Sequence, residues 1–266
     1  MVRLDKLLAN NGFGSRKDVK SLIHSGAVSV NGITPDAVDM HVDAEKDVVC
    51  VNGIPLVVKK HLYVMMNKKD GYVCSTKDGS HPTVYELLPV EFRRKFAGVE
   101  ASTVGRLDVD TEGLLIFTTD GDLLHRLTSP KNNVPKIYEV HLRDSVNDEN
   151  KRLYAERLAE GIHIEAEGRE EAADCLPAHI EWKDDRECCL TVREGKYHEV
   201  KRMFSALGNE VTYLKRIQMN NLKLDDSLQP GMCRELTPRE LLLLDVNTEK
   251  KKEPLKTVLE VHCHNR

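Results

Sequence analysis

The sequence predicts an α+β protein with a small N-terminal domain and a larger domain that follows it. At 266 residues, with 40% apolar and 31% charged side chains, the chain has the composition of a globular protein and is long enough for two cores. Helical and strand periodicities occur along its whole length without an internal repeat. We expect a first domain over residues 1–54, a linker over 55–61, a second domain over 62–246 and a mobile tail over 247–266.

The composition narrows the classes of function. No apolar run approaches 18 residues and the N-terminus is not a signal peptide, so we expect a cytoplasmic protein without membrane association. Seven cysteines without a Cys-x-x-Cys motif indicate reduced thiols, and no metal site is expected. A net charge of −4 argues against a uniformly basic nucleic-acid binder but permits local basic patches.

The first fifty residues predict two helices and a hairpin. Leu4, Leu7 and Leu8 share a helical face that ends at Asn10-Asn11-Gly12, and Ser15 with Asp18 forms a capping-box pattern that opens a helix over 16–25. Asn31-Gly32 predicts a tight turn between two strands.

This arrangement resembles the S4 RNA-binding domain, which has the α-L fold. On the pattern alone, the basic side chains of the second helix would be a solvated helix face. The resemblance implies that they contact structured RNA through its shape and phosphates: Arg3, Arg16, Lys17 and Lys20.

The larger domain alternates strands and helices. The pattern predicts a strand over 62–68 that turns at Asp70-Gly71 into a second strand over 72–75, and a short helix over 83–88. Further expected strands cover 114–118, 136–140, 178–182, 188–192 and 211–217, and further helices cover 123–127, 147–160, 200–207 and 240–244.

The most informative stretch is Gly105-Arg106-Leu107-Asp108-Val109-Asp110-Thr111-Glu112-Gly113-Leu114-Leu115. Read by spacing, it is an acidic turn before a buried strand, and its aspartates would be ordinary turn formers. Its residue sequence resembles the motif of the RsuA-type ribosomal RNA pseudouridine synthases. The resemblance implies a mainly antiparallel mixed sheet flanked by helices, with Asp108 as the catalytic residue; Asp110 does not match the motif.

Two further stretches carry the same resemblance. Lys136-Ile137-Tyr138-Glu139-Val140 matches a strand whose tyrosine stacks on the target base, although a packed aromatic would be the plain interpretation. On its pattern alone, the segment 193–204 indicates a solvated Lys-Arg pair. The resemblance implies instead that Lys201 is the basic residue that pairs with the catalytic aspartate. The resemblance also implies that Arg216 contacts the RNA backbone and that Arg106 fills the space left by the base. Lys69 stands where the family usually has proline.

The implied reaction is the isomerisation of uridine to pseudouridine in ribosomal RNA. It needs no cofactor, in keeping with the lack of dinucleotide, P-loop and metalloprotease motifs. Asp108 could attack C1′ as a nucleophile or remove a proton from C2′, and the sequence leaves both open. We expect a monomer whose partner is 16S ribosomal RNA or a small-subunit assembly intermediate. The alternatives are 23S ribosomal RNA, a non-catalytic S4-type RNA-binding protein, and a hydrolase that uses Asp108 with Asp110.

Overall fold

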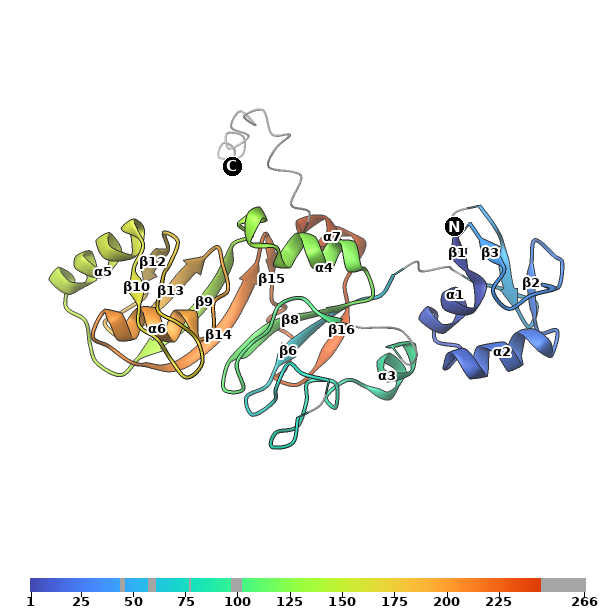
Figure 1. The fold of residues 1–266 in the computed structure, drawn as a ribbon, viewed down its shortest axis with the longest axis horizontal. Helices are drawn as coiled ribbons and strands as arrows, with labels where there is room; N and C mark the ends of the chain where they lie inside the picture. Colours follow the sequence, from blue (N-terminus) through green and yellow to red (C-terminus); the bar gives the residue numbers. More distant parts are fainter. Residues whose placement is uncertain (44–45, 57–60, 77, 97–101, 245–266) are drawn as a thin grey trace, which may run out of the picture.

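The computed structural model describes residues 1–43, 46–56, 61–76, 78–96 and 102–244, which form an N-terminal unit and a larger α+β unit (Figure 1). Most of the predicted linker and the whole predicted tail therefore lie outside the described residues. Among the described residues, no helix has both the length and the apolar character needed to cross a bilayer.

The N-terminal unit packs two helices against short strands. Its elements are β1 (Val2–Arg3), α1 (Leu4–Asn10), α2 (Arg16–His24), β2 (Val28–Val30), β3 (His41–Val42), β4 (Val49–Val51) and β5 (Ile54–Pro55). The predicted capping box is present, with Ser15 and Asp18 each satisfying the other's backbone N–H. Leu4, Leu7 and Leu8 are fully buried in a core of their own, as their helical spacing predicts.

The predicted Asn31-Gly32 turn forms, but the hairpin after it was wrong. Val30 and Ile33 exchange two backbone hydrogen bonds across the turn, of 2.8 and 3.0 Å, and the chain then leaves the sheet. The strand that pairs with β2 is β4. Pro35 supplies a physical reason, because it has no N–H to continue a ladder.

The larger unit is built on one nine-stranded sheet. Its main path runs β12-β13-β9-β14-β8-β6-β16, with β15 paired to β14 and β7 paired to β8. Only β14 and β8 run parallel, so the sheet is mixed and mainly antiparallel, as expected. The strands are β6 (Tyr63–Lys68), β7 (Ser102–Thr103), β8 (Glu112–Thr118), β9 (Lys136–Leu142), β12 (His179–Trp182), β13 (Glu187–Val192), β14 (Val211–Met219), β15 (Leu222–Lys223) and β16 (Cys233–Glu235). A separate hairpin joins β10 (His163–Ile164) to β11 (Ala173–Asp174).

Helices cover the sheet. They are α3 (Val90–Phe96), α4 (Gly121–Thr128), α5 (Asp148–Glu160), α6 (Glu199–Ala206) and α7 (Pro238–Leu243), with a 3₁₀ turn at Pro130–Asn132. In Figure 1, α4 and α7 lie together on one side of the strands β8 and β6, and α5 and α6 lie at the other end of the sheet. Gly161 ends α5 with φ of 90°, and Thr237 with Glu240 forms a capping box on α7.

Strand β8 is buried on both faces, which explains its continuous apolar run. Leu115 and Phe117 belong to one hydrophobic cluster, whereas Leu114 and Ile116 belong to a second cluster on the opposite face. Alternate side chains of a strand point to opposite faces, so each face of β8 meets its own core. The loop that precedes β8 is thereby attached to a strand that is buried on both faces.

Two local predictions were wrong. No strand forms over 72–75, because β6 already has β8 and β16 on its two edges; a single bridge joins Val73 to Thr83. No helix forms over 83–88 either. There the N–H of Val84 donates to the carbonyl of Val73 at 3.0 Å, and the N–H groups of Glu86 and Leu88 donate to carbonyls three residues back, so the segment forms turns rather than a helix.

Candidate active site

The loop between β7 and β8, residues 104–111, is held by hydrogen bonds to its backbone carbonyls from Lys68, at the end of β6, and from the segment that follows β6. The Nζ of Lys68 donates to the carbonyls of Val109 and Thr111 at 3.0 and 2.7 Å, and also to that of Lys69 at 3.2 Å. The N–H of Gly71 donates to the carbonyl of Val109 at 2.9 Å. The loop therefore has a fixed path, as a loop that carries a reacting group requires.

Lys68 is fully buried and has no carboxylate among these hydrogen-bond partners. Burial lowers the pKa of its ammonium group, and the charges of nearby acids partly offset this. Three carbonyl oxygens thus take the place of water around the ammonium. The sequence predicted a strand over 62–68 but gave no sign that Lys68 would hold the loop.

The structure brings Asp108 and Lys201 together, as the sequence implied, but adds Asp110 to the pair. The Nζ of Lys201, on α6, lies 3.7 Å from Asp108 Oδ2 and donates to Asp110 Oδ1 at 2.6 Å. Burial opposes ionisation of Asp110, but the hydrogen bond and charge of Lys201 outweigh it and lower the pKa of that carboxyl. Sequence reasoning set Asp110 aside because it lies outside the motif, whereas in space it is the closer partner of Lys201.

His198 is a neighbour of Asp108 that the sequence analysis did not single out. Its Nε2 lies 3.8 Å from Asp108 Oδ1, and its Nδ1 lies 3.0 Å from Glu167 Oε1. Its place three residues before Lys201, at the start of the same helix, was the only signal that could have indicated this position.

Tyr138 and Arg216 lie opposite each other on adjacent strands. Tyr138 of β9 pairs with Arg216 of β14, and Arg216 pairs in turn with Gly113 at the start of β8. Burial raises the pKa of the Tyr138 hydroxyl; interaction with the Arg216 guanidinium opposes this, and the charge of Asp108 acts on the same hydroxyl. The sheet register therefore places Tyr138 in line with Arg216 and with Gly113, at the start of β8, the strand that follows the Asp108 loop.

Arg216 is in a different place from that which RNA-backbone contact implies. Its side chain is 1% exposed, and its Nε donates to the carbonyl of Leu114 at 2.8 Å. Its Nη2 is buried and has no hydrogen-bond partner among the described residues. In this structure Arg216 lies beneath the loop, next to Tyr138, and not on a surface where phosphates would meet it.

A buried charged cluster lies behind Tyr138. Burial and the charge of Arg216 lower the pKa of Lys136 to about 8. Burial, together with the hydrogen bond and charge of Glu194, raises the pKa of Glu199 to about 8. Glu199 therefore holds its proton near neutral pH, a feature that no sequence pattern indicated.

The same cluster contains a set of possible metal ligands. Ligand atoms of Cys175, Glu194 and Glu199 lie within 4.8 Å of one another. Burial raises the pKa of the Cys175 thiol to about 11, and the ammonium group of Lys196 already pairs with Glu194. A cation therefore already balances the charge of this set, and the expectation of no metal site stays a prediction.

The remaining predicted residues lie at the surface. Arg106 is exposed two residues before Asp108, and Arg16, Lys17 and Lys20 are exposed on α2. Arg3 is engaged by Asp5, with hydrogen bonds of 3.1 and 2.9 Å, and its side chain is 49% exposed. The basic residues of α2 are thus available to a polyanion, whereas Arg3 already forms an ion pair with Asp5 of the same domain.

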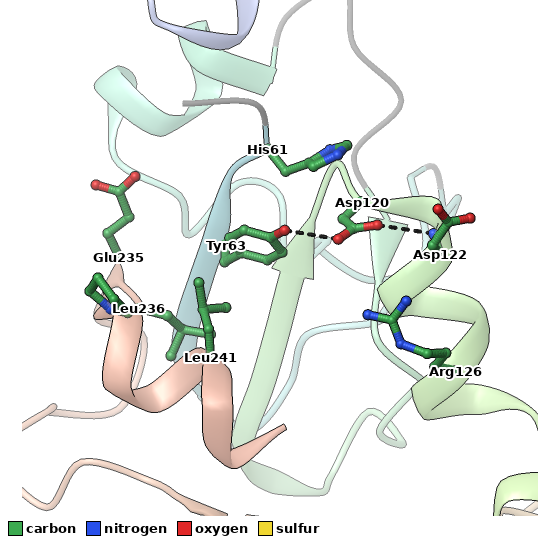
Figure 2. Close-up of a pocket in the computed structure, with 9 residues that line it drawn as sticks. His61, Tyr63, Asp120, Asp122, Arg126, Glu235, Leu236 and Leu241 are labelled. Carbon is green, nitrogen blue, oxygen red and sulfur yellow. Dashed lines mark hydrogen bonds between the residues drawn. The ribbon is translucent and has the colours of Figure 1, made fainter. Parts of the chain in front are cut away.

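Two hollows flank β8 at opposite ends. A cavity of about 180 Å³ lies beside the Asp108 loop, lined in part by Asp110, Lys201 and Tyr213. Figure 2 shows a larger cavity of about 630 Å³ at the far end of β8, where the Tyr63 hydroxyl donates to Asp120 at 2.8 Å and Arg126 points toward the same acid. Lys201 lines the smaller cavity, whereas Asp108 lines neither of these two cavities.

Comparison with known proteins gives consistent matches over both units. The family described as RNA pseudouridylate synthase matches residues 62–206, and the S4 domain matches residues 2–49. A relative from Bacillus subtilis, described as an uncharacterized RNA pseudouridine synthase, is 45% identical over 92% of this chain and 98% of its own length.

Relatives described as ribosomal small subunit pseudouridine synthase A, from Vibrio vulnificus and Haemophilus influenzae, are 41% and 39% identical over 90% of this chain and 98% of theirs. A solved crystal structure of a pseudouridylate synthase is 36% identical, covers 92% of this chain and 100% of its own, and superposes with a TM-score of 0.61. The chain therefore belongs to the RNA pseudouridylate synthase family and carries an N-terminal S4 domain.

Proposed function

We propose that this protein isomerises a uridine of ribosomal RNA to pseudouridine, with Asp108 as the catalytic residue. In this reaction the N1–C1′ bond of the nucleoside breaks, a C5–C1′ bond forms, and the proton of C5 is replaced by one at N1. No group is gained or lost overall. One carboxylate close to the sugar can start the reaction, either by attack on C1′ or by removal of a proton from C2′.

The observation that carries the proposal is the Asp108–Lys201 contact of 3.7 Å on a loop fixed by Lys68. A carboxylate that must remain charged while RNA covers it needs a fixed cation nearby, and Lys201 supplies one. Tyr138 lies on β9, two strands away from β8, and could stack on the extruded base. Such stacking returns about 1–3 kcal/mol of the cost of unstacking the base.

The rival hydrolase has less support. Paired-carboxylate hydrolysis needs one carboxylic acid with a raised pKa, so that it can donate a proton. The pKa of Asp110 is lowered, because Lys201 donates to its carboxylate at 2.6 Å. Asp110 is thus a poor general acid, and we assign it the role of orienting Lys201.

We further propose that the substrate is 16S ribosomal RNA, bound by the S4 domain and modified by a monomer in the cytoplasm. Relatives at 37–41% identity over 90% of this chain are described as ribosomal small subunit pseudouridine synthase A. The exposed basic residues of α2 suit a phosphate-directed contact. A non-catalytic S4-type RNA-binding protein is disfavoured, because the chain has all three residues that the motifs imply for the reaction: Asp108, Tyr138 and Lys201.

The test is to incubate the purified protein with unmodified 16S RNA, 23S RNA and small-subunit assembly intermediates, and to map pseudouridine in each. We expect one modified uridine, in 16S RNA or in the intermediate. A modified site in 23S RNA would overturn the choice of substrate, and RNA binding without any pseudouridine would overturn the enzymatic proposal. Released uracil would instead indicate hydrolysis.

A further inference from the structure

His198 has an unusual backbone. It is the N-cap residue of α6, with φ of 46° and ψ of 30° in the left-handed region, and its side chain caps no N–H of the helix. Residues with a Cβ occupy this region at a cost, and they do so where the surrounding structure holds them and where a side chain must be aimed.

Both ring nitrogens of His198 face carboxylates. Nδ1 lies 3.0 Å from Glu167 Oε1, and Nε2 lies 3.8 Å from Asp108 Oδ1. The ring also stacks on that of Tyr197, with centroids 3.8 Å apart and planes 20° apart. The imidazole is thus held on one face and at one nitrogen, and its other nitrogen points toward the catalytic carboxylate.

Glu167 is itself held in place from α6. It lies on the loop between β10 and β11, where Glu167 and Glu170 exchange two backbone hydrogen bonds of 3.0 Å. The side chain of Arg202, 7% exposed, donates to the carbonyl of Glu165 from two nitrogens and to that of Glu171 at 2.9 Å. One buried guanidinium therefore clamps both ends of the turn that presents Glu167.

The two oxygens of Asp108 thus face different groups. Lys201 lies 3.7 Å from Oδ2, but its short hydrogen bond, of 2.6 Å, goes to Asp110. His198 lies on the Oδ1 side. Among the described residues, these are the two basic side chains within 4.0 Å of the Asp108 carboxylate.

We propose that His198 is a positioning residue for Asp108 and is itself held by Glu167. Its Nε2 faces Oδ1 and limits the rotation of the carboxylate, while Lys201 acts at Oδ2. This inference rests on the proposed function, because it assigns His198 a role in the same reaction. The charged or titratable groups that face the ring or its partners are Asp108, Glu167, Lys201, Asp110 and Arg202.

The first test compares His198→Asn with wild type in single-turnover reactions on the RNA substrate across pH. Asparagine tolerates the left-handed backbone but cannot reach Asp108. Because misplacing a reacting group by 1 Å can cost about 10²-fold, we expect a loss of roughly 10- to 100-fold in the rate with unchanged RNA affinity. His198→Lys, which keeps a cation, should recover part of the rate.

The pH profile separates positioning from a merely structural role. A positioning role predicts that the wild-type rate has an alkaline limb that is absent in His198→Asn. An unchanged rate and profile in His198→Asn would overturn the proposal. So would a wild-type rate that falls on the acid side in a His198-dependent way, because the ring would then act as a base.

The second test uses Glu167→Gln, with Glu170→Gln on the same loop as the matched control. If Glu167 acts through His198, the double variant with His198→Asn should be no slower than His198→Asn alone. Additive losses, or an equal loss in Glu170→Gln, would contradict this chain of contacts.

A readout without turnover keeps this inference distinct from the proposed function. In RNA-free protein, the NMR signals of the His198 ring should move in Asp108→Asn and in Glu167→Gln but not in Glu170→Gln, because each of the first two changes alters a group that faces the ring. Failure of wild type to form pseudouridine would end the proposed function and leave this result standing. Unmoved ring signals would end the inference even in an active enzyme.

Discussion

Gly113→Ala tests how the sheet fixes the candidate active site. Gly113 lies where β8 begins, in the only parallel contact of the sheet, and has φ of 101°. A Cβ at this position would lie 2.3 Å from the backbone oxygen of Arg216 and 2.9 Å from its nitrogen. Neither backbone atom can move without opening the contact between β14 and β8.

Two costs add up in this variant. A non-glycine residue in a sparsely populated backbone region costs about 1–3 kcal/mol, and overpacking against atoms that cannot withdraw costs about 1–3 kcal/mol. We therefore expect a loss of about 2–6 kcal/mol in the free energy of unfolding. For a domain of about 200 residues, this corresponds to a fall of at least about 4 °C in Tm.

The assay is denaturant and thermal unfolding followed by tryptophan fluorescence. The chain has one tryptophan, Trp182, and it lies on β12 of the same sheet. Gly121→Ala is the control, because a Cβ there has no atom within 4 Å and the residue begins α4; we expect no loss of stability. If Gly113→Ala were as stable as Gly121→Ala, the close packing of β8 on β14 would be refuted.

Three further predictions concern charged groups. Lys201→Met should lower the single-turnover rate about 10²- to 10³-fold with the fold intact, because Asp108 loses a fixed cation; near-normal rates would remove Lys201 from the mechanism. Lys68→Met should slow the reaction and make the loop around Asp108 more susceptible to proteolysis, because three carbonyl oxygens lose their donor; unchanged values for both would refute that role.

Glu199 provides a prediction on stability against pH. Its carboxyl ionises near 4.5 when unfolded but holds its proton to about 8 when folded, so folding takes up a proton between these values and stability falls as pH rises through that window. Glu199→Gln should flatten this decline in unfolding experiments from pH 5 to 7.5, and an unchanged slope would contradict the raised pKa of Glu199.

The sequence predicted most of the elements that local patterns control. The Ser15–Asp18 capping box, the end of the helix predicted over 147–160 and the buried run of β8 each follow from a short-range rule, and each is present. The errors fall where long-range pairing competes with local preference. Residues 72–75 have strand character, yet β8 and β16 occupy both edges of β6. The segment lies beside the Asp108 loop instead, where Cys74 accepts a hydrogen bond from the N–H of Leu107.

In the candidate site, too, local motifs predicted some residues, and others could be found only from the tertiary structure. Asp108, Tyr138 and Lys201 could be singled out because they lie in motifs, and Asp108 and Lys201 do form an ion pair. Their supporting groups could not be found from spacing. Glu167 lies 31 residues before His198 in the chain, and Lys68 reaches carbonyl groups more than 40 residues away. Such contacts depend on tertiary packing, which no local pattern encodes.

The most direct test of the central claim is Asp108→Asn, an isosteric change that removes the charge of one carboxylate. Measured in single-turnover reactions on the RNA that wild type modifies, pseudouridine formation should fall by about 10⁴-fold or more. RNA affinity and thermal stability should remain those of wild type. Pseudouridine formation at a normal rate in this variant would show that Asp108 does not carry out the chemistry.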